Sequence, residues 1–127
     1  LAGLDGMTVA DPTGPLDRWF GSAASAARDA CNRWLRDVDA AGYRDAYRVF
    51  AQQDGPSDAD LRNLHCPALF LTGADEPNST PEMSRRMAAL APLGRSEIME
   101  GAAHMLPMTH ADRVNAILKS FIKEVAQ

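Results

Sequence analysis

The sequence CPALFLTGADEP (residues 66–77) decides the fold, because it joins a short apolar run to a turn that contains two acids. Pro67 precedes the run and Gly73 ends it, and apolar residues occupy both of its alternating faces. Such a run is typical of a strand buried within a sheet that carries helices on both sides. Asp75 and Glu76 follow directly after this predicted strand.

The rest of the second half continues the alternation of helix and strand. Residues 78–92 predict a helix with Ser79 or Thr80 as its N-cap, and RSEIMEG (residues 95–101) predicts a second, weaker strand. After a histidine turn, Thr109 is the expected cap of a last amphipathic helix. This order indicates parallel β-α-β units. Two parallel strands alone do not make a stable sheet, so we expect further strands from elsewhere.

The first half, residues 14–64, is predicted to be helical, because its apolar residues recur at steps of three and four. The pattern fits one long helix or two helices broken near Gly21, then a helix from Tyr43 to about Gln52, with Ser57 as a further N-cap. The large side chains expected on the inner faces of these helices are Trp19, Phe20, Trp34, Tyr43, Tyr47 and Phe50.

Composition excludes several classes of function. The chain has 127 residues and a net charge of −4, and it lacks the clustered Lys and Arg of a nucleic-acid-binding protein. No apolar run reaches the roughly 20 residues of a membrane span, and the first residues have no basic signal-peptide region, so we expect a cytoplasmic protein. Cys31 and Cys66 have no disulfide or zinc spacing and are expected to be reduced and buried, with no metal site.

Two loops carry the candidate chemistry. GADEP (residues 73–77) follows the first predicted strand, and GAAHM (residues 101–105) follows the second and contains His104. Loops at the carboxyl ends of parallel strands converge, so an acid of the first loop could orient His104 as a general base. The plainer alternative is that the acids are turn residues and that His104 binds backbone. A catalytic histidine would require a nucleophile on an earlier strand.

Two segments that contain these loops resemble the carboxyl-terminal part of the α/β-hydrolase family. They are CPALFLTGADEPNSTPEM (residues 66–83) and SEIMEGAAHMLPMTHADRVNAILKSFI (residues 96–122). The family's triad follows the chain order nucleophile, acid, histidine. The resemblance implies that His104 is the triad histidine and that Glu76, three residues after Gly73, is the acid. Asp is the commoner acid in this family, so Asp75 stays an alternative.

The resemblance also implies an α/β fold class, namely the carboxyl-terminal portion of an α/β-hydrolase fold preceded by a helical cap-like segment. Residues 1–64 resemble the helical cap that often precedes this region, and residues 65–127 resemble the end of the α/β core. The G-x-S-x-G nucleophile turn of the family is absent. The nearest string, GSAAS (residues 21–25), lacks the second glycine and falls in a helical pattern. We therefore expect the chain to be a fragment whose nucleophile lies on an amino-terminal portion outside it.

The expected function of the parent protein is serine-type hydrolysis of small, apolar esters, lactones or related carbonyl compounds, without a cofactor. The family also includes C–C bond hydrolases, dehalogenases and cofactor-free peroxidases. No nucleic-acid or membrane partner is expected. The alternative hypothesis is a non-catalytic α/β fragment or hydrolase-like binding protein, which would pair with a second copy because apolar helix faces would otherwise be exposed.

Overall fold

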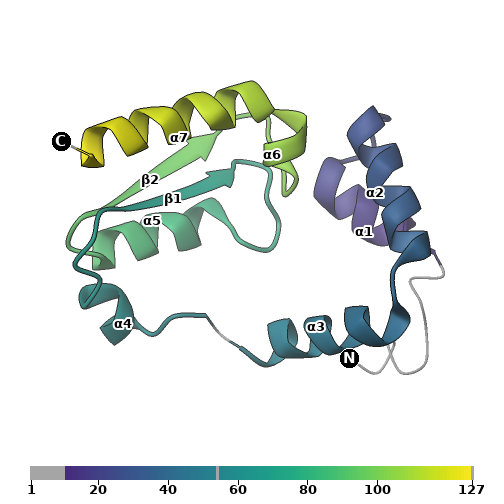
Figure 1. Ribbon diagram of the computed structural model, residues 1–127, viewed down its shortest axis with the longest axis horizontal. Coiled ribbons are helices and arrows are strands. Elements are labelled where there is room, and N and C mark those ends of the chain that lie inside the picture. The colour runs from purple at the N-terminus through teal and green to yellow at the C-terminus, as the bar shows by residue number, and fades with distance from the viewer. Residues whose placement is uncertain (1–10, 54, 127) are drawn as a thin grey trace. The chain divides into compact units, whose positions relative to one another are not determined.

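The computed structural model describes residues 11–53 and 55–126. Figure 1 shows its elements in chain order: α1 (Thr13–Phe20), α2 (Ala26–Asp37), α3 (Ala40–Gln52), α4 (Asp58–Arg62), β1 (Ala68–Gly73), α5 (Pro81–Leu90), β2 (Gly94–Met99), α6 (Leu106–Thr109) and α7 (Ala111–Val125). They form two compact units. The first holds the described residues 11–17, 21–53 and 55, and the second holds Arg18–Phe20 with the described residues from Pro56 onward.

In the first unit, the helical chain breaks at Gly21, which confirms one of the two alternatives that the sequence left open. Gly21 has φ of 72°, a left-handed conformation that glycine adopts without steric penalty. Ser25 then caps α2 by accepting a hydrogen bond from the Arg28 N–H at 3.1 Å. The Arg28 guanidinium closes the turn, because it donates to the Gly21 carbonyl at 2.7 Å and pairs with Asp17 at 2.5 Å.

Helix α3 begins three residues earlier than the apolar pattern predicted, because Asp39 caps it. The Asp39 carboxylate accepts a hydrogen bond from the Gly42 N–H at 2.6 Å. Tyr43, Tyr47 and Phe50 follow one another along one face, with ring centroids 6.2 Å and 5.9 Å apart. Side chains three and four residues apart meet on a helix, so this aromatic row follows directly from the sequence spacing.

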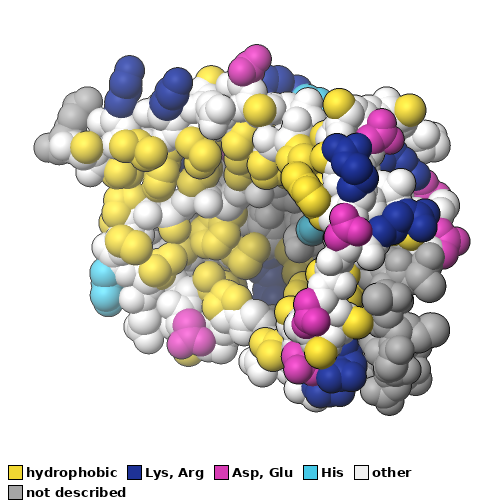
Figure 2. Space-filling model, turned by 45° about the vertical axis from the view of Figure 1, so that its right-hand side comes forward, with side chains coloured by type: hydrophobic (Ala, Val, Ile, Leu, Met, Phe, Trp, Pro, Cys, Tyr) yellow, Lys and Arg dark blue, Asp and Glu magenta, His cyan; other side chains and the backbone are white. Residues whose placement is uncertain are grey.

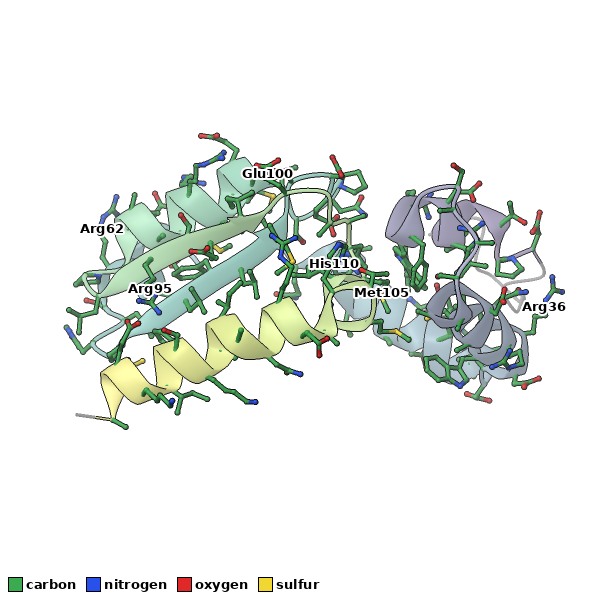
Figure 3. The ribbon with its side chains drawn as sticks, turned by 90° about the horizontal axis from the view of Figure 1, so that it is seen from above. Arg36, Arg62, Arg95, Glu100, Met105 and His110 are labelled. Carbon is green, nitrogen blue, oxygen red and sulfur yellow. The ribbon has the colours of Figure 1, made fainter. Side chains whose placement is uncertain are left out.

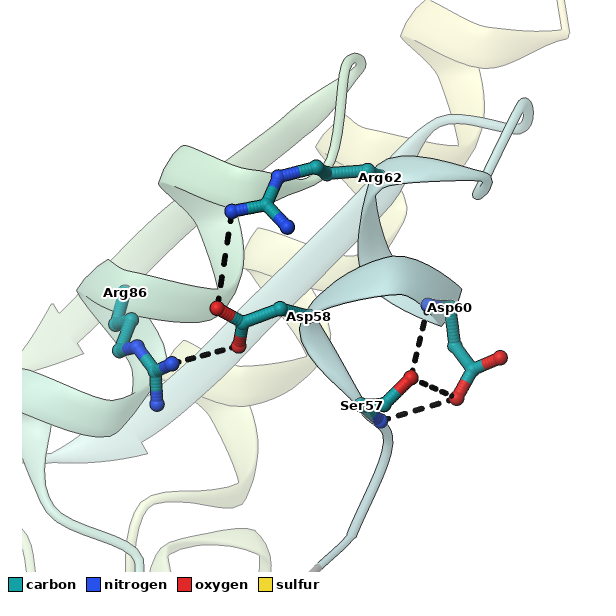
Figure 4. A network of polar contacts seen from close by, with 5 residues as sticks. All are labelled: Ser57, Asp58, Asp60, Arg62 and Arg86. Carbon is teal, nitrogen blue, oxygen red and sulfur yellow. Dashed lines mark hydrogen bonds and ion pairs between the residues drawn. The ribbon is translucent and has the colours of Figure 1, made fainter.

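The short helix α4 belongs to the second unit and is joined to α5 by charge (Figure 4). Ser57 and Asp60 form a reciprocal capping box, in which the Ser57 hydroxyl accepts from the Asp60 N–H and the Asp60 carboxylate accepts from the Ser57 N–H. Asp58 pairs with Arg86 of α5 at 2.6 Å and with Arg62 at 3.7 Å. The predicted N-cap at Ser57 is therefore confirmed.

In the described residues, β1 and β2 form a two-stranded parallel sheet, in register from Ala68 opposite Gly94 to Gly73 opposite Met99. Helices α5 and α7 lie on opposite sides of this sheet (Figure 1). Thr80 caps α5 by accepting from the Met83 N–H. The strand, helix, strand, helix order predicted for this half of the chain is confirmed, and the parallel register brings both strand ends to one edge.

The core of the second unit lies between the sheet and α7. Met99, Ala102, Leu106 and Val114 are its buried members, with Leu71 and Ile117 packed against them. At the other end of α7, the Arg95 guanidinium of β2 pairs with the Glu124 carboxylate and lies 4.9 Å from the centroid of the Phe121 ring (Figure 3). Ala102 and Leu106 of this core flank His104 in the sequence, so the histidine loop is anchored in the buried part of the unit.

Two local predictions are wrong. Thr109 does not cap the last helix, because it is the last residue of the separate short helix α6, which begins at Leu106. The Thr109 hydroxyl instead donates to the Met105 carbonyl, and His110 is the residue at the N-cap of α7. Cys66 is exposed rather than buried, since it lies before the first residue of β1, whereas Cys31 is buried as expected.

No helix among the described residues is long and apolar enough to cross a membrane. The second unit nevertheless exposes several large apolar side chains: Met83, Leu93, Leu118, Ile122 and Val125. Figure 2 shows hydrophobic side chains gathered below α7, on the face turned toward the viewer.

Candidate active site

The acid loop that follows β1 is held against the histidine loop by backbone hydrogen bonds. The Ala74 N–H donates to the Met99 carbonyl at 2.9 Å, and the Asp75 N–H donates to the Ala102 carbonyl at 3.0 Å. These bonds continue the pairing of the two strands by two residues beyond their ends. The convergence expected at the strand ends is therefore real, and it is made by main-chain atoms.

Gly73 permits this close approach of the two loops. A Cβ built on Gly73 would lie 2.0 Å from the Ala102 carbonyl oxygen and 3.0 Å from the Ala103 nitrogen. Both are backbone atoms, so no side-chain movement could relieve the clash. The residue that ends β1 must be glycine for the acid and histidine loops to meet in this way.

The Glu76 side chain is buried, with 2% of its surface exposed, and both of its oxygens have partners. Oε1 accepts hydrogen bonds from the backbone N–H groups of Asn78 at 2.7 Å and Ser79 at 3.2 Å. Oε2 lies 2.5 Å from Nδ1 of His104. A carboxylate is costly to bury unless hydrogen bonds replace its water, and here all three partners do so.

Asp75, the alternative acid, lies differently. It is exposed, and within the described residues only its backbone N–H is engaged, with the Ala102 carbonyl. The structure therefore brings Glu76, and not Asp75, to His104. The extra methylene of glutamate lets a carboxylate that starts in the turn reach the imidazole while it also accepts from the backbone ahead of α5.

His104 lies in the loop that begins at Gly101, whose φ of 70° again favours glycine. With its Nδ1 beside the Glu76 carboxylate, the neutral ring carries its proton on Nδ1 and leaves Nε2 as a proton acceptor. No described residue forms a hydrogen bond with Nε2, and 39% of the side-chain surface is exposed. The arrangement can accept a proton from a group that approaches Nε2, and the carboxylate can stabilise the imidazolium that results.

The sequence did not predict one contact at this site. Trp19 was expected on the inner face of a helix, and its indole stacks on the His104 imidazole, with ring centroids 5.9 Å apart and planes 27° apart. The carbonyl of Trp19 also accepts a hydrogen bond from the Met105 N–H at 3.2 Å. Helical periodicity could place Trp19 on an apolar face, but it contains no information on which distant residue that face would meet.

The described residues include no group of three or more His, Cys, Asp or Glu side chains placed to hold a metal ion. Glu76 and His104 are engaged with each other, and His65 and His110 lie at other places in the chain. Figure 3 labels His110 and Met105, which lie on either side of α6. His110 contacts the hydroxyl of its neighbour Thr109 through Nδ1 at 2.8 Å.

Comparisons with known proteins agree with this architecture. Residues 2–117 match the profile described as "Alpha/beta hydrolase family". The chain is 39% identical over 111 residues to (E)-2-((N-methylformamido)methylene)succinate hydrolase of Acinetobacter baylyi, covering 86% of this chain and 42% of that protein. Its fold is similar to the crystal structure of bromoperoxidase from Bacillus anthracis, with a TM-score of 0.80 and 21% identity over 96% of this chain and 46% of that chain. The chain thus spans less than half the length of the relatives it matches.

Proposed function

Because the chain belongs to the α/β-hydrolase family, with the partial fold that the sequence predicted, we propose that it is the carboxyl-terminal part of a serine-type hydrolase of small carbonyl compounds. His104 is the general base of this proposal and Glu76 is the acid that orients it. The observation that carries the proposal is the 2.5 Å contact between Glu76 Oε2 and His104 Nδ1, made by a buried carboxylate and a partly exposed ring.

The proposed mechanism needs a nucleophile that this sequence does not contain, because no G-x-S-x-G turn is present in it. A serine hydroxyl supplied by the preceding part of a longer protein would give its proton to Nε2 of His104 and attack the substrate carbonyl. Glu76 would hold the Nδ1–H tautomer and stabilise the imidazolium until the proton passes to the leaving group. The assignment of residues 1–64 as a cap-like segment and a cytoplasmic location are parts of the same proposal.

Two chemical types of substrate have support. The aromatic side chains that the sequence concentrates in the cap-like segment favour an apolar ester or lactone. The Acinetobacter relative is named as a hydrolase of a succinate that carries an N-methylformamido group, which favours a small carboxylated amide. Both are carbonyl compounds open to attack by an activated serine, and no cofactor is needed for either.

The experiment uses the longer protein that contains this chain. We expect a fluorophosphonate to label its serine, and we expect kcat/KM to fall about 10³- to 10⁴-fold in His104→Ala and Glu76→Gln. His110→Ala is the matched histidine control and should stay within about twofold of the unmodified protein. p-Nitrophenyl acetate, a simple lactone and the succinate amide, assayed side by side, identify the substrate type. An active, folded sample that takes up no fluorophosphonate would contradict the proposal.

A second candidate, self-association of the isolated chain, has its own support in the exposed apolar surface of the second unit. Leu118, Ile122 and Val125 are exposed on one helix, α7, and the sheet of the described residues has only β1 and β2. Surfaces of this kind are usually covered by protein. Sedimentation velocity should show a dimer or larger species that Ile122→Lys weakens, whereas a compact monomer would rule the idea out.

A further inference from the structure

Trp19 is attached to the histidine loop at two consecutive residues. Its carbonyl accepts the Met105 N–H, and its indole stacks on the His104 ring. Arg18–Phe20 are the only described residues before Pro56 that group with the second unit, the unit that contains the site. One contact fixes the backbone of the loop, and the other lies against the face of the imidazole.

The contact with Glu76 does not by itself fix the plane of the imidazole. It holds the ring at one atom, Nδ1, and a ring held at one edge atom can still tilt about that contact. His104 is 39% exposed, so packing on its other sides is incomplete. The direction in which Nε2 points depends on this tilt, and proton transfer requires that direction to be set within a narrow range.

We propose that Trp19 is a positioning residue for His104. The flat indole fixes the plane of the imidazole while Glu76 fixes its Nδ1 edge, so that Nε2 is held toward the position of the nucleophile. The negative π face of the indole also favours the imidazolium form that exists after proton transfer. In this role Trp19 transfers no proton and forms no covalent bond with the substrate. This inference rests on the proposed role of His104 as the general base.

The first test is made on the full chain, without any substrate. The ring protons of His104 are observed by NMR after selective labelling of histidine, with His65 and His110 as references in the same spectrum. A stacked indole displaces the His104 ring signals upfield. We expect this displacement to persist in Trp34→Phe, to decrease in Trp19→Phe and to vanish in Trp19→Leu. Trp34 is the matched control because it is 60% exposed in the first unit.

The second test is kinetic and uses the longer protein. Trp19→Leu should lower kcat about 2- to 12-fold with little change in KM, which corresponds to the free energy of one aromatic contact. Trp19→Phe keeps an aromatic face and should recover most of that loss. A defect confined to KM would identify Trp19 as a substrate contact and overturn the proposal, as would equal losses in the two variants.

The two tests separate this inference from the proposed function. If Trp19→Leu leaves the His104 ring signals unchanged, the stacking is absent in solution and the inference is wrong, whatever the activity. If His104→Ala leaves kcat unchanged, the proposed function is wrong even where the ring signals show stacking. Circular dichroism of each variant establishes that it is folded, and Trp19→Phe supplies the comparison if Trp19→Leu is not.

Discussion

The backbones at Gly73 and Ala102 lie so close together that a Cβ on Gly73 would be 2.0 Å from the Ala102 carbonyl oxygen. This crossing connects the sheet to the candidate site, because the acid loop begins at one of these residues and the histidine loop contains the other. Strand geometry and site geometry therefore depend on the same pair of backbones.

Gly73→Ala should consequently damage both stability and the site. The methyl group must push two main chains apart, and we expect a loss of about 1–3 kcal/mol in the free energy of unfolding. Gly14→Ala is the matched control, because its Cβ would meet nothing within 4 Å and alanine favours the helix there. Denaturant unfolding compares the two. A Gly73→Ala variant as stable as the unmodified chain would show that the loops do not cross this closely in solution.

Glu76→Gln should change the tautomer of His104. Oε1 can still accept from the backbone of Asn78 and Ser79, but the amide NH₂ that replaces Oε2 would face the Nδ1–H of the imidazole. The ring relieves this opposition by moving its proton to Nε2, which removes its capacity to accept a proton there. Nitrogen-15 NMR of the histidine rings measures the tautomer directly.

Asp75→Asn is the comparison for that experiment. Its side chain has no hydrogen bond in the described residues, so the His104 tautomer should not change. A change of tautomer in Asp75→Asn and none in Glu76→Gln would reassign the acid of the site to Asp75.

The capping box of α4 makes a separate prediction about stability. Ser57→Ala removes the hydroxyl that accepts from the Asp60 N–H, and the free energy of unfolding should fall by about 1 kcal/mol. Ser22→Ala is an exposed control in the turn after α1, where no cap depends on the hydroxyl. Thermal unfolding followed by circular dichroism measures both. Equal Tm values for the two variants would mean that α4 contributes little to the cooperative structure.

Glu124 gives a pH dependence. Hydrogen bonds from Arg95 and then Ser120 hold the pKa of the Glu124 carboxyl below its usual value of 4.5. A folded-state pKa that is lowered contributes stability in full above the unfolded value and loses it as the pH falls through the folded value. The Tm difference between the unmodified chain and Glu124→Gln should therefore be constant above about pH 5.5 and disappear in more acidic solution. A difference that grows on acidification would contradict this.

The sequence predicted those parts of the fold that depend on neighbouring residues. The apolar run before Gly73 gave β1, Thr80 before Pro81 gave the start of α5, and Ser57 gave a true cap, because each depends on a few adjacent residues. The prediction failed at Thr109. This residue lies inside the short helix α6, so it cannot be the N-cap of α7.

The candidate site was predictable only in outline. Convergence of parallel strand ends placed an acid near His104, but it could not say which of two adjacent acids turns inward. That choice depends on the path of the loop after Gly73, which the backbone bonds to Met99 and Ala102 determine. The contact of Trp19 with His104 depends on how a distant segment meets the loop, and local periodicity contains no such information.

Glu76 has a consequence for how this protein can change over evolutionary time. The same carboxylate that meets the imidazole also accepts two N–H groups that lead into α5, so its length is fitted to a turn as well as to a ring. Replacement by the shorter Asp would remove support from a helix entrance and from the imidazole in one step. A descendant with Asp at this position would first have to rebuild the loop, which makes the choice of acid a property of the whole turn.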